Sequence, residues 1–150
     1  MTVPGSCFRI WSWCSPVSEA PLPLRAKAAL ALRIWALLAR VLVGLRREPL
    51  PAFVARLGKP GSPRRDRHSA AKLSHAVDRS LRIGSRRPRC LVNALVLYRL
   101  LHEQDDHAEL VIGLPARPTD KDAHAWVELG GVDVGPPPGR SGHKELARFS

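Results

Sequence analysis

The spacing of apolar residues changes along this chain, from a helical repeat up to His102 to a strand-like alternation from His107 onward. Helices place apolar residues three and four positions apart, whereas a half-buried strand alternates every second residue. A chain in which helices come first and strands follow is typical of an α+β fold rather than of alternating βαβ units. The sequence therefore predicts N-terminal helices, one further central helix, and a small antiparallel sheet packed against that helix.

Helical spacing predicts four helices before the strands begin. They are expected over residues 25–47, 50–57, 69–83 and 91–102. In the first of them Arg33, Arg40 and Arg47 recur every seven residues on one stripe, while leucine, isoleucine and valine cover much of the rest. We interpret this segment as a core helix with one solvated basic stripe. A helix that lies in the plane of a membrane or binds a partner is the alternative.

Alternation and turn residues predict three strands. They are expected over residues 107–114, 123–129 and 132–134. Gly130 and Gly131, between the last two, fit the two-residue turn of a β-hairpin. The proline-rich residues 136–139 end the strand pattern, and residues 144–149 are expected to form a polar tail.

The net charge of +11, from 24 Lys and Arg against 13 Asp and Glu, is unevenly distributed. Residues 21–90 hold 17 basic and three acidic residues, a net charge of +14, whereas residues 91–150 hold six basic and nine acidic residues, a net charge of −3. This basic front half supports the hypothesis of a non-catalytic module that binds nucleic acid or anionic membranes. The basic segments lack interleaved aromatic side chains and any nucleic-acid motif, so nucleic acid is not expected as a partner. Peripheral association with a membrane stays open.

The chain is predicted to have a loose arm over residues 1–24 and a single domain over residues 25–150. The first twenty residues lack the basic start and continuous apolar run of a secretory signal. Arg33 and Arg40 interrupt the most apolar stretch, and an arginine at the centre of a spanning helix costs about 2.5–3.5 kcal/mol, which argues against a membrane span. Three cysteines at unrelated spacings, without a CxxC pair, fit free thiols in a reducing cytoplasm.

Cys90 stands where a basic loop ends and the apolar helix begins. The unpaired N–H groups and the macrodipole at a helix N-terminus favour a thiolate over a thiol. Arg86, Arg87 and Arg89, just upstream, act in the same direction. Cys90 is therefore a candidate nucleophile, and the alternative is a small buried apolar residue.

His124 lies at the start of the second predicted strand, in the segment Ala-His-Ala-Trp-Val-Glu. Alternation places His124, Trp126 and Glu128 on one face, and small alanines on the other face leave room for a helix to pack closely. If the helix that starts at Cys90 packs there, its first turn meets the start of this strand. A thiol–imidazole pair is then expected, although a lone histidine would more often be structural. Trp126 either lines a substrate cleft beside the histidine or fills the core.

Three segments together resemble a known family. They are Arg87-Pro88-Arg89-Cys90-Leu91-Val92 with the apolar helix that follows, Ala108-Glu109-Leu110-Val111-Ile112-Gly113, and Ala123-His124-Ala125-Trp126-Val127-Glu128. In this order they are similar to the transglutaminase-like leader peptidases of lasso-peptide biosynthesis, the B2 proteins, over about residues 25–135. The resemblance implies a cysteine peptidase with a papain-like core that removes the leader from a ribosomally made precursor peptide. It also implies two partners, a separate leader-recognition protein and an ATP-dependent cyclase.

The resemblance implies Cys90 as the nucleophile and His124 as the general base, which later protonates the leaving amine. The family's third residue is an acid about twelve positions after the histidine, where this chain has Pro136. Asp133 is a possible substitute, but the hairpin turn pairs it with Glu128, four residues from the histidine and roughly 13 Å along the strand. A bulge would shorten this distance, and a backbone carbonyl could also hold the imidazole. Loss of the acid usually weakens such a site.

Other residues of the chain offer less. Asp120 and Asp122 closely precede the histidine and could curl back toward it, although they also fit a solvated loop. The Cys90 backbone N–H is the natural candidate for an oxyanion donor. No cofactor and no metal are expected, because the chain has no GxxxxGK[ST] loop and its remaining histidines lack the spacing of metal ligands.

Overall fold

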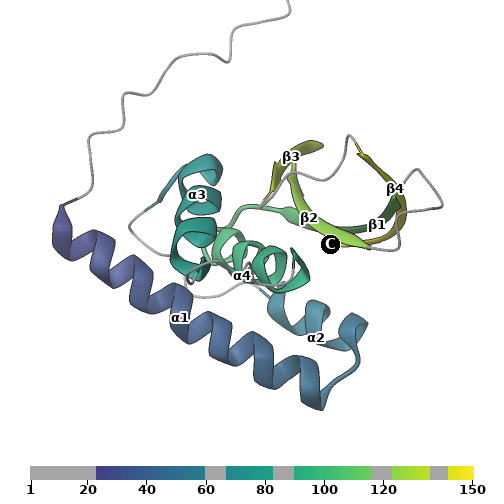
Figure 1. The fold of residues 1–150 in the computed structure, drawn as a ribbon, viewed down its shortest axis with the longest axis horizontal. Helices are drawn as coiled ribbons and strands as arrows, with labels where there is room; N and C mark the ends of the chain where they lie inside the picture. The colour runs from purple at the N-terminus through teal and green to yellow at the C-terminus, as the bar shows by residue number, and fades with distance from the viewer. Residues whose placement is uncertain (1–22, 60–66, 83–89, 116–122, 136–141) are drawn as a thin grey trace, which may run out of the picture.

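The computed structural model describes residues 23–59, 67–82, 90–115, 123–135 and 142–150. Its elements, in chain order, are α1 (Leu24–Arg47), α2 (Leu50–Leu57), α3 (Ala70–Leu81), α4 (Cys90–His102), β1 (Ala108–Pro115), β2 (His124–Leu129), β3 (Val132–Gly135) and β4 (His143–Phe149). Helices come first and a four-stranded antiparallel sheet follows (Figure 1), which confirms the predicted α+β class. The arm expected over residues 1–24, with Cys7 and Cys14, lies outside the described residues except for its last two positions.

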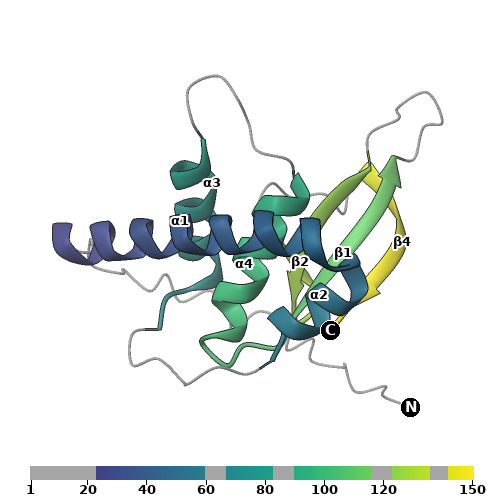
Figure 2. The ribbon, with the colours of Figure 1, turned by 90° about the horizontal axis from the view of Figure 1, so that it is seen from below.

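Helix α4 is the centre of the fold. It is enclosed because α1, α2 and α3 pack around it on one side and β1 and β2 on the other (Figures 1 and 2). Its sequence CLVNALVLYRLLH explains this position, since a helix that is apolar nearly all round is stable only when it is buried. Leu95 and Leu97 are fully buried, and burial raises the pKa of the Tyr98 hydroxyl. The remaining elements are therefore arranged around α4.

Helix α2 folds back against the end of α1 through one close approach. Gly44 of α1 lies against the ring of Phe53 from α2, and a Cβ atom at this glycine would overlap that ring. Phe53 is fully buried, as are Ile34 and Val41 on the inner face of α1. The absence of a side chain at Gly44 therefore sets how closely the two helices pack.

The basic stripe predicted on α1 is only partly solvated. Arg40 and Arg47 are exposed, as expected, but Arg33 turns inward and forms an ion pair with Glu103 at the end of α4. The same glutamate accepts a hydrogen bond from Nε of Arg99 at 3.0 Å. The prediction was wrong for Arg33 because the spacing within one helix does not show that an acidic side chain from another helix will reach it.

Two polar side chains near the end of α4 hold neighbouring segments in place. Nη1 of Arg99 donates hydrogen bonds to the carbonyl oxygens of Leu57 and Lys59, both at 2.8 Å. Gln104, only 5% exposed, accepts a hydrogen bond from the N–H of His68 at 2.7 Å and donates one to its carbonyl oxygen at 2.9 Å. The end of α2 and the approach to α3 are thereby fastened to α4.

The sheet has the strand order β3-β2-β1-β4, and all neighbouring strands are antiparallel. The hairpin between β2 and β3 turns at Gly130 and Gly131, whose φ angles of +57° and +78° are those that a tight two-residue turn needs. Glu128 pairs with Asp133, as the turn predicts. The local signal of the two glycines therefore sets the register of this hairpin correctly.

The polar tail expected over residues 144–149 is instead β4, an edge strand paired with β1. The reason lies in β1, where the adjacent residues Leu110 and Val111 are both fully buried. A strand with apolar side chains on both faces belongs in the interior of a sheet and needs a partner on each edge. The prediction was wrong because β4 itself is mostly polar and exposed. Only its first residue, Ala147 and Phe149 are partly buried.

Candidate functional site

Helix α4 begins at Cys90, next to the start of β2. Its sulfur atom lies 3.7 Å from the carbonyl oxygen of Ala123, the residue directly before His124. At this distance the thiol donates a weak hydrogen bond to the carbonyl. Cys90 is partly exposed and packs at the border of the core. The predicted meeting of the first turn of α4 with the start of the histidine strand is confirmed.

The two faces of β2 have different surroundings. Ala125 and Val127 belong to the core around α4, as the small side chain at position 125 predicts, whereas Trp126 is buried on the other face. Because side chains alternate along a strand, His124 shares the face of Trp126. The two rings are stacked, with centroids 6.1 Å apart. His124 is the first residue of β2 and directly follows Ala123, whose carbonyl oxygen Cys90 contacts, while its ring lies with that of Trp126 on the face of β2 away from α4.

His143, the first residue of β4, brings a third ring to this face. Its centroid lies 4.9 Å from that of His124 and 6.2 Å from that of Trp126. β1 lies between β2 and β4, and strands two places apart are separated by about 9.5 Å. The two imidazole rings therefore lean toward each other over β1.

Gly113 of β1 is what allows this approach. It pairs with His124 in the sheet, and it has no side chain to stand between the rings. A Cβ atom there would lie 2.8 Å from the ring of Trp126 and 2.9 Å from the carbonyl oxygen of Lys144 in β4. The rings of β2 and β4 thus come together over a gap in β1 that only glycine leaves open.

A buried carboxylate supports this cluster of rings. Glu128 is 2% exposed; one of its oxygens accepts a hydrogen bond from the indole N–H of Trp126 and the other from Nη1 of Arg148, both at 3.0 Å. Arg148 also bonds Glu145 and Glu109, and these hydrogen bonds, with that of Glu145 largest, raise its pKa. The negative charge of Glu128 is compensated, and its role here is to hold the Trp126 ring beside the histidine. Trp126 fills buried space next to His124, on the face away from α4.

Asp133, the possible substitute for the third catalytic residue, lies near the turn between β2 and β3, at the opposite end of β2 from His124. Asp133 pairs with Glu128, four residues from His124, and its Oδ1 accepts a hydrogen bond from the N–H of Gly135 at 2.9 Å. The bulge in this hairpin lies beyond Asp133 and leaves it opposite Glu128. Asp133 therefore shapes its own turn. The remaining candidates lie outside the described residues: Asp120, Asp122, Pro136, Arg86, Arg87 and Arg89.

His143 is the residue of this site that sequence reasoning missed. It lies at the start of the segment expected as a tail, 19 positions after His124, and no spacing rule connects the two. The only usable signal was indirect, namely the apolar run of β1, which calls for a strand on each side. Within the described ranges, no three His, Cys, Asp or Glu side chains are grouped so that they could hold a metal ion.

The structure is thus an α+β domain with a cysteine at the start of its central helix and a histidine at the start of the adjoining antiparallel strand. A family model described as the transglutaminase-like superfamily matches residues 33–148. The chain therefore belongs to the transglutaminase-like superfamily, which includes cysteine proteases and transferases. No curated protein and no solved structure matches the chain.

Proposed function

We propose that this protein is a cysteine peptidase that removes the leader from a ribosomally made lasso-peptide precursor. The observation that carries the proposal is the 3.7 Å contact between the sulfur of Cys90 and the carbonyl oxygen of Ala123. That carbonyl belongs to the peptide group that ends at the Cα atom of His124, so the nucleophile lies beside the backbone of the residue proposed as its base. Membership of a superfamily of cysteine proteases and transferases agrees with this pair.

In the proposed reaction the sulfur of Cys90 attacks the carbonyl carbon of the peptide bond that joins leader and core. His124 takes the thiol proton, for which the hydrogen bond to Ala123 must break, and then gives that proton to the leaving amine. The C–N bond breaks, and the leader remains on sulfur as a thioester. Water that transfers a proton to the imidazole then attacks the thioester, which releases the leader as a carboxylate and restores the thiol.

The start of α4 contributes to the same reaction through its backbone. The first N–H groups of a helix have no partner within the helix. In the proposed reaction those next to Cys90, including its own, stabilise the oxyanion that forms when the sulfur adds to the carbonyl. This role follows from the position of the nucleophile at the first residue of the helix.

His143 is proposed as the positioning residue for His124, in place of the acid of the resembled family. Packing between His143 at 4.9 Å and Trp126 at 6.1 Å restricts the orientation of the His124 ring. If ring packing is what matters, His143→Ala should lower kcat/KM about 10- to 100-fold, whereas His143→Phe should restore most of the activity. Equal loss of activity in both variants would contradict a packing role.

The proposal is tested by incubating the full chain with the precursor peptide and its leader-recognition protein, and by following leader release with mass spectrometry. Cys90→Ala should abolish release, while Cys14→Ala, the matched control, should cleave at the wild-type rate. Release by Cys90→Ala at the wild-type rate would overturn the proposal. A leader product that carries an amide in place of a carboxylate would instead indicate a transferase.

The proposal also assigns partners and a compartment. The leader-recognition protein brings the precursor to the site, and a separate ATP-dependent cyclase uses the released core, all in the cytoplasm. The proposed hydrolysis uses a thiol, an imidazole and water. Co-purification of the tagged chain with the recognition protein, with and without precursor, measures whether the first partnership forms.

A further inference from the structure

Helix α1 has a second apolar face, opposite the one that packs in the core. Its inner face contains the fully buried residues Ile34 and Val41. Five large apolar side chains, which we call the outer face, point to the other side: Leu24, Leu32, Trp35, Leu42 and Val43, with exposed fractions of 83%, 72%, 41%, 46% and 47%. With 3.6 residues per turn, the two sets lie on opposite sides of the helix. Figure 2 shows α1 in front of α3 and α4, with no described element over its outer side.

Exposed apolar side chains are concentrated on this helix. Of the eight large apolar residues that are exposed in the described part of the chain, five belong to α1. Single exposed apolar residues are ordinary, but a continuous stripe of them marks an interaction surface. By length and composition α1 could also cross a membrane. Since Ile34 and Val41 lie in the protein core, however, α1 is part of the folded domain, and only its outer face is free for contact.

Positive charge borders the outer face. α1 contains six Lys or Arg and no Asp or Glu. Arg33 is paired with Glu103, whereas Arg40 and Arg47 have no ion pair or hydrogen bond to any other residue that the structure describes. Burial is the larger cause that lowers the pKa of Arg99, and the positive charge of Arg40 lowers it further. Glu48, the acid next to Arg47, is paired with Arg56, so positive charge remains in excess at this end of α1.

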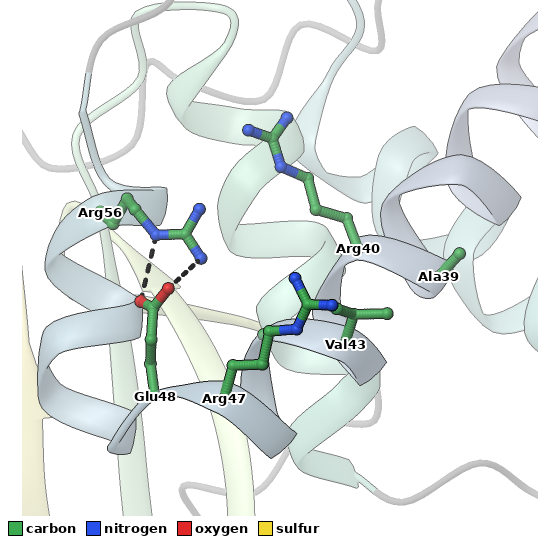
Figure 3. A pocket seen from close by; sticks show the side chains of 7 residues that line it. Ala39, Arg40, Val43, Arg47, Glu48 and Arg56 are labelled. Carbon is green, nitrogen blue, oxygen red and sulfur yellow. Dashed lines mark hydrogen bonds and ion pairs between the residues drawn. The ribbon is translucent and has the colours of Figure 1, made fainter.

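An open pocket of about 380 Å³ lies at the C-terminal end of α1, next to the outer face. It is lined by apolar side chains of α1 and by charged side chains where α1 is followed by α2: Ala39, Val43, Arg40, Arg47, Glu48 and Arg56. Arg56 is held by Glu48 through two contacts of 3.0 and 3.1 Å (Figure 3). Three arginines and one glutamate give the pocket a net charge of +2. Its chemistry suits a phosphate group attached to an apolar body.

We propose that the outer face of α1 binds the surface of a membrane that contains anionic phospholipids, with the pocket holding the phosphate group of one lipid. Helices that lie in a membrane interface have tryptophan and leucine on one side and lysine and arginine at the borders, as α1 does. The stems of Arg40 and Arg47 extend along apolar surface while their guanidinium groups reach phosphate oxygens. From Leu24 to Val43 the contact is about 28 Å long at 1.5 Å per residue, a straight line that suits a flat surface.

A second copy of this chain fits the outer face less well. Two copies of α1 packed face to face would bring Arg40 and Arg47 of both copies to the borders of one interface, and α1 has no acidic residue to pair with them. Like charges brought together at an interface are unfavourable. An anionic lipid surface provides the opposite charge along the whole length of the helix, so charge complementarity selects the membrane.

The test is co-sedimentation of the full chain with vesicles of phosphatidylcholine, with and without phosphatidylserine. We expect binding to the vesicles that contain phosphatidylserine, and this binding should weaken as the salt concentration rises. Leu32→Gln combined with Trp35→Gln removes two apolar contacts and should weaken binding about tenfold or more. Val132→Gln combined with Leu146→Gln, at positions 64% and 65% exposed on β3 and β4, is the matched control and should bind as the wild type does.

A second pair of variants tests the charges. Arg47→Gln in the pocket should weaken binding about fivefold, because one basic residue near an anionic surface contributes on the order of that factor. Arg79→Gln, an exposed arginine on α3, changes the net charge equally and should have a much smaller effect. Equal weakening by both would mean that total charge, and not the outer face of α1, determines the binding.

Three further results would overturn the proposal. The first is no binding to phosphatidylserine vesicles at low salt. The second is self-association of the chain without lipid that is lost in the Leu32 and Trp35 variant, which would assign the outer face to a second copy. The third is binding of inorganic phosphate in the pocket without any binding to vesicles, which would assign it to a free anion. None of these measurements uses precursor peptide, so their outcome is independent of the peptidase proposal.

Discussion

Replacing Gly113 with alanine tests how the rings of β2 and β4 come together. The added Cβ would meet the ring of Trp126 at 2.8 Å and the carbonyl oxygen of Lys144 at 2.9 Å, which is at least 0.5 Å closer than an ordinary contact of 3.4 Å. Trp126 is 2% exposed and hydrogen-bonded, and the carbonyl is backbone, so neither neighbour can move away freely. Overpacking of this kind costs about 1–3 kcal/mol, and the lower chain entropy of alanine in the unfolded state offsets about 0.4–1 kcal/mol. We expect a net loss of about 1–2 kcal/mol.

The measurement is urea and thermal unfolding of Gly113→Ala followed by circular dichroism, with Gly142→Ala as the control. For a chain of this length the loss corresponds to a midpoint lower by about 2–8 °C. A Cβ at Gly142 meets nothing within 4 Å, so that variant should be as stable as the wild type or slightly more stable. If Gly113→Ala unfolds at the wild-type midpoint, the tight packing over β1 described above is wrong.

Three further substitutions test the packing around α4. Gln104→Ala leaves both backbone groups of His68 without their partner and should lower the free energy of unfolding by about 1–3 kcal/mol in urea titrations, with Gln104→Glu in between. Burial lowers the pKa of His102 below its ordinary value of 6.5. The unfolded chain therefore binds this proton more readily than the folded chain, and the folded state loses stability as the pH falls below 6.5. His102→Gln should make the unfolding midpoint less dependent on pH between about pH 5 and 8. Gly44→Ala, which would gain about 1 kcal/mol in an open helix, should instead lower the thermal midpoint because the methyl group overlaps the buried ring of Phe53. A higher midpoint for Gly44→Ala would show that this ring can move.

The helices and the hairpin could be predicted because their signals are local. The bounds of α2 agree with the prediction at both ends, and two glycines were enough to specify the turn between β2 and β3. The contact between the start of α4 and the start of β2 was also predictable. It follows from Cys90 at a helix start and from Ala125, whose small side chain lets the helix approach the strand.

What the sequence did not reveal depends on contacts between distant segments. His143 joins the site only because β4 pairs with β1, and β4 has too few apolar residues to be recognised as a strand by itself. Arg33 was expected in solvent because its partner Glu103 belongs to another helix. The sequence also did not show which apolar residues of α1 would be exposed, Leu42 among them, because a helix with apolar residues on two sides does not indicate which side packs in the core.

The position of β4 in the chain has a consequence for how this protein reaches its fold. β1 finds its first partner, β2, nearby in the sequence, but its other edge stays open until residues after β2 and β3 return to it. Until then the segment around Leu110 and Val111 presents unpaired N–H and C=O groups beside apolar side chains, and an open edge of this kind is a template for strands from other chains. Pairing between distant strands is slow, so correct folding competes with aggregation during this interval. By pairing with β1, the mostly polar β4 closes this open edge. Loss of residues 143–149 should therefore promote aggregation of the chain in addition to removing His143 from the site.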